Sequence, residues 1–266
     1  MRLRRGISKI AVIAIIVIVV IAAVSVAAYY VTRPKPVKEV VIGSSLALTG
    51  KYAKGGKWYK MAWELAVEEI NEKGGIKGWK VKLIIEDDRS DPSYSASVLE
   101  KLIHEQHIVA TLGSFPTACT YPTSAIAEKY GIPYVGSGSA TKSLYERGFK
   151  TYFQLFPWTE RYLPAVLGVL EMASKMDPKP ETIAITYELT KWGEELFSVY
   201  SEGLAAEGYE IVFSEGYEPG TSDFTPIISK IMALNPDVYI DIGHTADEIT
   251  LTRQCAELGF NPKMFI

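Results

Sequence analysis

The sequence predicts an α/β fold with two similar lobes, preceded by one membrane-spanning helix. Three observations predict it. Strand-like and helix-like segments alternate from residue 40 onward, two parts of the chain repeat one strand–helix–strand scheme, and an uncharged apolar run fills positions 10–31. Strands that alternate with helices of about 10–15 residues are typical of parallel sheets covered by helices on both faces.

The composition is that of a globular protein with an acidic body. Apolar residues make up 48% of the chain and charged residues 22%. Residues 1–36 hold six Lys or Arg and no acid, so the rest has 22 basic against 31 acidic residues, a net charge of −9. A body of this charge repels phosphate backbones, and we therefore exclude nucleic acid as a partner.

The apolar run Ile10–Val31 is the clearest targeting signal. Its 22 residues would form a helix about 33 Å long, enough to cross a hydrocarbon core of about 30 Å. A cleavable signal has a shorter apolar region of about 7–15 residues, which favours a retained anchor, although cleavage after Ala28 is an alternative. Four basic residues precede the run, so we expect the body to lie outside the cell membrane. We assign residues 1–36 to the anchor and a Pro-containing spacer.

The first lobe is predicted over residues 37–156. Its first helix has Met61, Leu65 and Ile70 on one face and is stopped by Gly74-Gly75. The other segments continue the alternation of apolar strands and amphipathic helices. In order, they are strand 40–48, helix 58–71, strand 81–85, helix 95–105 (opened by Asp91-Pro92), strand 108–112, helix 119–129 and strand 132–135.

The second lobe is predicted over residues 157–266 and follows the same scheme. Its segments are strand 182–186, helix 193–206, strand 210–214, helix 224–233, strand 238–242, helix 247–258 and a strand from 263. Lys80–Gly113 and Tyr209–Gly243 share one order of strand, turn, helix, buried strand and glycine. Two like lobes that bind at the carboxyl ends of their strands imply a cleft between them. Chance recurrence of a common α/β unit is the alternative.

Two turns after predicted strands have the residues of a polar binding site. In the first, Gly113–Thr117, Thr117 stands at an N-cap position, where free backbone N–H groups attract a carboxylate or phosphate oxygen. The second, Gly136–Thr141, consists of small residues that allow close approach to the backbone. It is an incomplete dinucleotide loop, because Thr141 occupies the third glycine position. Simple helix capping and an ordinary strand-to-helix turn are the respective alternatives.

No catalytic or metal-binding constellation is predicted. No serine lies in a Gly-x-Ser-x-Gly segment. His104 and His107 lack a third metal ligand, and a solvated helix end explains them. Cys119 and Cys255 are expected as buried, unpaired thiols. We therefore expect neither a cofactor nor enzymatic activity.

Four segments resemble the branched-chain amino-acid binding proteins of ABC importers. They are Leu46–Gly50, Ala66–Gly78 (which contains Asn-x-x-Gly-Gly-Ile-x-Gly), Asp87-Asp88 with Asp91-Pro92, and Gly131–Pro133 with Gly138–Thr141. The resemblance covers about Val40 to Ile266. It implies the type I periplasmic-binding fold with two Rossmann-like lobes, and the role of an extracytoplasmic solute-binding component.

The resemblance also implies the first-lobe ligand contacts. Thr117 and Thr141 would hold the ligand's α-carboxylate, Thr141 together with Ala140 in one loop. The carbonyl of Ser139 would bind the ammonium, and Phe115 would line the pocket for the side chain.

In the second lobe, the resemblance assigns Trp192, which precedes Gly193-Glu194, and His244, which replaces the family's tyrosine. The family's ammonium-binding acid would fall just beyond Ile266, and about the last third of the family's length would be missing.

The implied ligand is leucine, isoleucine, valine or a related amino acid, and the implied partners are ABC permease subunits and the membrane. Two alternatives stay open on the same fold. One is a ligand-sensing ectodomain, and the other is a binder of amides, urea or aromatic acids.

Overall fold

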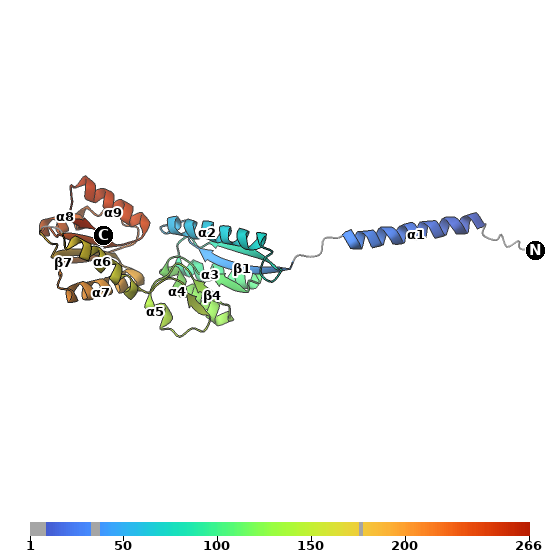
Figure 1. Ribbon diagram of the computed structural model, residues 1–266, viewed down its shortest axis with the longest axis horizontal. Coiled ribbons are helices and arrows are strands. Elements are labelled where there is room, and N and C mark those ends of the chain that lie inside the picture. Colours follow the sequence, from blue (N-terminus) through green and yellow to red (C-terminus); the bar gives the residue numbers. More distant parts are fainter. Residues whose placement is uncertain (1–8, 33–37, 176–177) are drawn as a thin grey trace, which may run out of the picture. The chain divides into compact units, whose positions relative to one another are not determined.

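The computed structural model describes residues 9–32, 38–175 and 178–266. The chain divides into two units, residues 1–38 and residues 39–266. The first unit contains helix α1 (Lys9–Thr32), whose side chains are described at positions 18–29 (Figure 1). Within the described residues, none of the helices has the length and apolar character needed to cross a bilayer. Of the predicted anchor Ile10–Val31, only the side chains at positions 18–29 are described, so the anchor stays a prediction.

The second unit is built on two parallel sheets. The first sheet has the strand order β2-β1-β3-β4-β5, with every neighbouring pair parallel. Its strands are β1 (Glu39–Leu46), β2 (Lys80–Asp87), β3 (Ala110–Leu112), β4 (Tyr134–Gly136) and β5 (Tyr152–Gln154). Because all strands run the same way, the turns that follow β3, β4 and β5 meet at one edge of this sheet.

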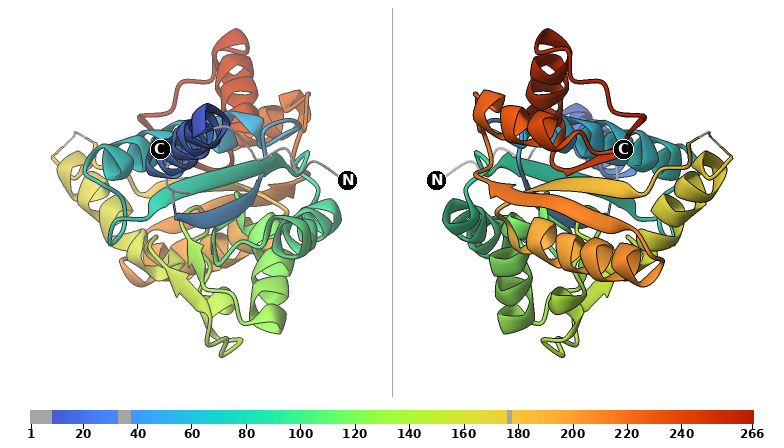
Figure 2. Two further views of the ribbon diagram at one scale, coloured as in Figure 1. Left: turned by 90° about the vertical axis from the view of Figure 1, so that its right-hand side faces the viewer. Right: turned by 90° about the vertical axis from the view of Figure 1, so that its left-hand side faces the viewer.

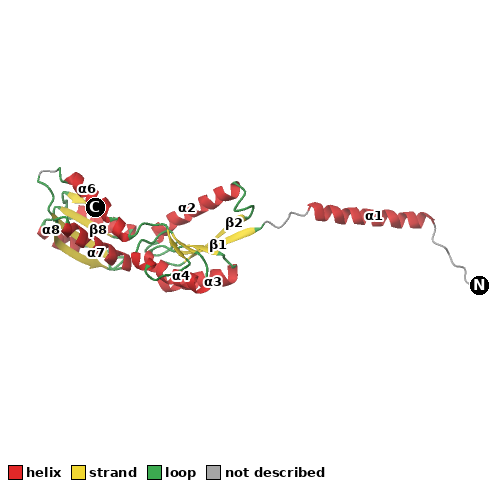
Figure 3. Cartoon of the chain, turned by 60° about the horizontal axis from the view of Figure 1, so that its bottom comes forward, coloured by secondary structure: helices red, strands yellow, loops and turns green. Residues whose placement is uncertain are grey.

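Helices lie on both faces of the first sheet. They are α2 (Ala53–Glu72), α3 (Pro92–Gln106), α4 (Thr117–Tyr130) and the short α5 (Lys142–Tyr145). The α3–α4 pair covers one face, where Leu99, Leu102 and Tyr134 belong to one buried core. Figure 3 shows α2 on the opposite side of β1. Asp91 caps α3 by accepting a hydrogen bond from the backbone N–H of Tyr94, with Pro92 in the first turn, as the sequence predicts.

The second sheet has the order β7-β6-β8-β9, again all parallel. Its elements are η1 (Thr159–Arg161), α6 (Leu163–Ala173), β6 (Thr182–Glu188), α7 (Lys191–Ala206), β7 (Glu210–Tyr217), α8 (Thr225–Leu234), β8 (Val238–Ile242), α9 (Thr245–Glu257) and β9 (Met264–Phe265). One core lies between the sheet and α6–α7, and a second between the sheet and α8–α9. In Figure 2 (right), the red α9 and the orange α7 lie on opposite sides of the strands.

The predicted α/β class with parallel sheets is confirmed, and several local expectations need correction. Helix α2 begins at Ala53, five residues before the predicted start, because Gly56 lets it approach β1 closely. A Cβ atom at Gly56 would lie 1.8 Å from the carbonyl oxygen of Ala47. Thr117 is the first residue of α4 and not its N-cap, which is Pro116. The sequence analysis did not identify α5, β5, η1 or α6.

Candidate ligand-binding site

A cavity of about 150 Å³ lies between the two sheets of the second unit. Six of the strands, namely β1, β3, β4, β5, β6 and β8, are each followed by a segment that contributes to its wall. The lining residues are Tyr59, Phe115, Thr117, Gly138, Ser139, Ala140, Phe156, Tyr162, Trp192 and His244. A cavity at the carboxyl ends of parallel strands is the usual ligand position in open α/β sheets.

Thr117 brings a hydroxyl and a helix N-terminus to the first-lobe wall. The residue is 4% exposed and begins α4. The N-cap Pro116 offers no side-chain hydrogen bond to the first turn. The first N–H groups of a helix have no partner within the helix and favour negative charge, so this end of the cavity suits a carboxylate.

The loop before α5 carries a second hydroxyl, that of Thr141, directly after the lining residues Ser139 and Ala140. Thr141 is fully buried, and its Oγ1 has no hydrogen-bond partner among the described residues. Thr141 does not cap α5 with its side chain. Instead, Glu195 of α7 accepts a hydrogen bond from the backbone N–H of Lys142 at 2.7 Å. A buried hydroxyl without a partner is costly, which favours a partner that arrives with a ligand.

The middle of the cavity is lined by rings. Phe115 lies against Tyr59, with ring centroids 5.2 Å apart, and against His244 at 5.6 Å. The ring of Trp192 is 5.0 Å from that of His244. Phe156 and Tyr162 complete the aromatic lining. Since Phe115 comes from the first lobe and His244 and Trp192 from the second, these contacts join the two lobes across the cavity.

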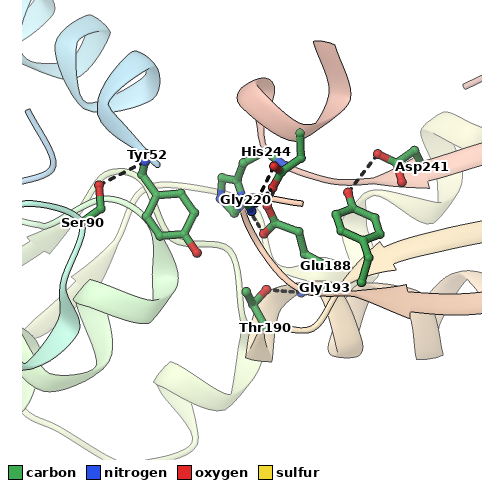
Figure 4. Close-up of polar contacts among 10 residues, drawn as sticks. Tyr52, Ser90, Glu188, Thr190, Gly193, Gly220, Asp241 and His244 are labelled. Carbon is green, nitrogen blue, oxygen red and sulfur yellow. Dashed lines mark hydrogen bonds and ion pairs between the residues drawn. The ribbon is translucent and has the colours of Figure 1, made fainter. Parts of the chain in front are cut away.

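A buried carboxylate fixes the position of His244 (Figure 4). Glu188, which is 0% exposed at the end of β6, lies 2.6 Å from the Nδ1 atom of His244. It also accepts the backbone N–H of His244 at 3.2 Å. Burial alone would raise the pKa of Glu188, but the hydrogen bonds and charge of His244 lower it below its ordinary value.

Asp247 extends this network. Both of its carboxylate oxygens accept the backbone N–H of Gly220, at 3.0 Å each. Burial raises the pKa of Asp247 to about 6, opposed by those hydrogen bonds and reinforced by the negative charge of Glu188. On the second-lobe side, the carboxylates of Glu188 and Asp247 therefore lie close to His244. No carboxylate is among the residues that line the cavity.

The structure brings together most of the residues that the sequence singled out. Six of the seven line the cavity: Phe115, Thr117, Ser139, Ala140, Trp192 and His244. Thr141 follows them directly in sequence, but its side chain is not part of the wall. The hydroxyl of Ser139 forms a hydrogen bond with the hydroxyl of Tyr152 at 2.9 Å.

Sequence reasoning missed Tyr59, Phe156 and Tyr162 of the cavity wall, and Glu188, which contacts His244. Glu188 could have been recognised from the sequence. It stands two residues after the predicted strand 182–186, just as His244, after Ile242 and Gly243, stands two residues after the predicted strand 238–242. Phe156 and Tyr162 follow elements that were not predicted. Within the described part of the chain, no group of three or more His, Cys, Asp or Glu is placed to hold a metal ion.

Comparison with known proteins agrees with this architecture. The family described as "Periplasmic binding protein" matches residues 39–266. A Leu/Ile/Val-binding protein homolog of Brucella abortus is 25% identical over 248 residues, which are 92% of this chain and 62% of the relative. The chain thus spans somewhat less than two thirds of that relative's length.

Solved structures show the same fold. The branched-chain amino acid transporter substrate binding protein of Streptococcus pneumoniae, solved with isoleucine, superimposes with a TM-score of 0.74 at 21% identity, over 85% of this chain and 63% of that one. A solute binding protein of Rhodopseudomonas palustris, solved with 3,4-dihydroxybenzoic acid, also gives 0.74, at 18% identity over 83% and 59%. The resemblance found in the sequence is confirmed, and the chain belongs to the periplasmic binding protein family, with the type I fold.

Proposed function

We propose that this chain is the extracytoplasmic solute-binding component of an ABC importer, which holds a small carboxylate-bearing solute in the cavity between lobes 37–156 and 157–266. The observation that carries the proposal is the cavity itself. It combines a helix N-terminus and hydroxyl groups on the first-lobe side with apolar rings from both lobes. The chain binds and releases the solute without a chemical step.

The first-lobe turns would hold the carboxylate. Thr117 offers its hydroxyl and backbone N–H, and Thr141 offers a buried hydroxyl that has no partner among the described residues. Hydrogen bonds to a charged group contribute about 1.5–3 kcal/mol each. The carbonyl of Ser139 would accept a hydrogen bond from an α-ammonium.

The second lobe would cover the solute. Trp192 and His244 contribute rings from the segments after β6 and β8. A cavity of about 150 Å³ is large enough for a benzene-sized group. In size and apolar lining, the cavity therefore suits leucine, isoleucine, valine or a related amino acid, in agreement with the names of the Brucella relatives.

An aromatic acid is the second candidate. The cavity walls carry six rings, from Tyr59, Phe115, Phe156, Tyr162, Trp192 and His244. No acidic side chain is among those lining residues, so a solute without an ammonium group fits equally well. The Rhodopseudomonas palustris neighbour was solved with such an acid.

A panel of solutes tests the proposal. The full chain is titrated calorimetrically with the amino acids, with benzoate and with hydroxybenzoates, and its melting temperature is recorded with each. A true ligand at about 100 times its Kd should stabilise the protein by about 2.7 kcal/mol. A panel in which no carboxylate binds, while uncharged amides do, would contradict the carboxylate site.

We further propose that Ile10–Val31 anchors the chain in the cell membrane with the binding lobes outside, where they deliver solute to permease subunits. Fractionation should place the protein in the membrane fraction. N-terminal sequencing of the mature protein that began at or after Tyr29 would show that the segment is a cleaved signal.

A further inference from the structure

His244 lines the cavity, and Glu188 engages one of its two ring nitrogens. A carboxylate only accepts hydrogen bonds, so the Nδ1 atom, 2.6 Å from Glu188, carries a proton. Glu188 is fully buried, and it also accepts the backbone N–H of His244. The ring therefore cannot turn over without breaking a buried, charge-assisted hydrogen bond.

The other ring nitrogen, Nε2, is directed away from Glu188. No hydrogen bond to Nε2 is found among the described residues. The rings of Tyr52, Phe115 and Trp192 lie around the imidazole, with centroids 4.9, 5.6 and 5.0 Å from it. Nε2 is thus a polar atom in a wall made of aromatic surface.

The charges around His244 limit what it can bind. Three carboxyl groups of the second lobe, those of Glu188, Asp247 and Glu248, interact electrostatically with it. This negative surrounding disfavours a second carboxylate on the solute. A hydroxyl group carries no charge, and it can donate to a neutral imidazole or accept from a protonated one.

We propose that His244, positioned by Glu188, makes the site selective for solutes with a hydroxyl group on the part that faces the second lobe. The inference rests on the proposed function, in which the first-lobe turns hold a carboxylate. A purely aliphatic side chain would leave Nε2 buried without a partner, and a site built to hydrogen-bond a hydroxyl rejects the analogue that lacks it.

Two pairs of solutes, the members of each differing in one hydroxyl group, provide the test. They are L-threonine against L-valine and 4-hydroxybenzoate against benzoate, each titrated into the full chain by calorimetry. We expect the hydroxylated member of at least one pair to bind about tenfold more tightly or better.

Two variants assign the preference to this pair of residues. Glu188→Gln should reduce the preference for the hydroxylated member of a pair, because it weakens the orientation of Nε2. Glu188→Gln combined with His244→Phe should abolish the preference, and it leaves no buried carboxylate unpaired. His104→Phe is the matched control, since the Nε2 atom of His104 contacts the Tyr130 hydroxyl at 3.0 Å outside the cavity.

The outcomes separate the two proposals. Equal or tighter binding of valine and benzoate, or a preference that survives in the double variant, would overturn the role of His244 and leave the solute-binding function standing. Equal weakening of both members of a pair by Glu188→Gln would show a merely structural role, which also overturns the inference. If none of the four solutes bound, while uncharged amides did, the carboxylate site itself would fail, and the selectivity would fail with it.

Discussion

The carboxylate of Glu195 in α7 accepts a hydrogen bond from the backbone N–H of Lys142, the first residue of α5, at 2.7 Å. The same side chain accepts hydrogen bonds from the hydroxyls of Ser143 and Thr159. A residue of the second lobe therefore does the work of an N-cap for a helix of the first lobe. As a consequence, the hydroxyl of Thr141, which stands at the N-cap, is not used for capping.

We expect Glu195→Ala to destabilise the protein and to weaken solute binding. The variant loses three hydrogen bonds to a partly buried carboxylate, and we estimate a cost of about 1–3 kcal/mol in the free energy of unfolding. Affinity should fall as well, because the loop of Ser139, Ala140 and Thr141 loses its support. Urea unfolding and calorimetry measure the two effects. Glu202→Ala, an exposed change on the same helix, should alter neither by more than about 0.5 kcal/mol; an equal loss in both variants would contradict the capping role.

Thr141→Val should separate stability from binding. The substitution replaces a buried hydroxyl without a partner by a methyl group of similar shape, so the free energy of unfolding should rise by about 1 kcal/mol. Solute affinity should fall by about 1–3 kcal/mol, since the hydrogen bond to the carboxylate is lost.

Thr117→Ala should weaken binding to a similar extent with little change in stability, because this side chain does not cap α4. The control is Thr250→Val, where the exposed hydroxyl only contacts a carbonyl of its own helix. Unchanged affinity in both site variants would refute the proposed carboxylate position, and a stability loss in Thr141→Val would mean that its hydroxyl has a partner.

Asp241 should make the protein less stable as the pH rises. Burial raises its pKa from 3.8 to about 7, although Thr186 and Tyr217 donate hydrogen bonds to it. The folded chain therefore binds this proton more tightly than the unfolded chain does. Between about pH 4 and 7, the group should lower the free energy of unfolding by up to about 1.4 kcal/mol per pH unit.

Asp241→Asn tests this dependence. The amide carries no charge to bury. The free energy of unfolding of the variant should therefore increase relative to that of the natural chain from pH 5 to pH 7, and the difference should then stay constant. Asp88 and Asp247, whose pKa values burial raises to about 6, contribute in the same direction in both proteins and cancel. Urea unfolding at pH 5, 6, 7 and 8 provides the curves. Parallel curves would show that the carboxyl has an ordinary pKa.

The sequence allowed most of the fold to be predicted because burial imposes its pattern on long elements. Strands such as β6 and β8 are buried on both faces, and their apolar stretches Ile183–Ile185 and Val238–Ile240 reveal them. Helix α6 was missed although Val166, Leu170 and Ala173 give it a buried face, because Pro164 and Gly168 obscure the helical pattern. Strand β5 has three residues and α5 has four, too few for any periodicity to show.

The site could be predicted only where it follows a recognisable strand. Thr117, Ser139 and His244 all stand just after apolar strands, which the sequence reveals. Tyr59 reaches the cavity from within α2, and nothing in the spacing of that helix marks it. Glu188 and Asp247 matter through tertiary contacts with His244 and Gly220, which depend on how β6, β8 and α9 pack.

At Gly138, the addition of a single methyl group should change the shape of the cavity. A Cβ atom there would lie 2.9 Å from Cδ2 of Phe115 and 3.0 Å from Cζ of Tyr59, closer than van der Waals contact allows. Phe115 also packs against Tyr52 and His244, so the space left for it to move into is the cavity. Gly138→Ala should therefore push the rings into the ligand volume and weaken solute binding about tenfold or more, at a stability cost of about 1–3 kcal/mol.

Calorimetry with the best solute of the panel, beside urea unfolding, measures both effects of Gly138→Ala. The control is Gly168→Ala in the exposed interior of α6, where a Cβ atom would meet nothing within 4 Å. That change should raise the free energy of unfolding by about 0.5–1 kcal/mol, because alanine favours the helix, and it should leave affinity unchanged. If Gly138→Ala bound solute as tightly as the natural chain, the rings of Tyr59 and Phe115 would have to stand clear of the solute, and the aromatic cavity would not be the binding site.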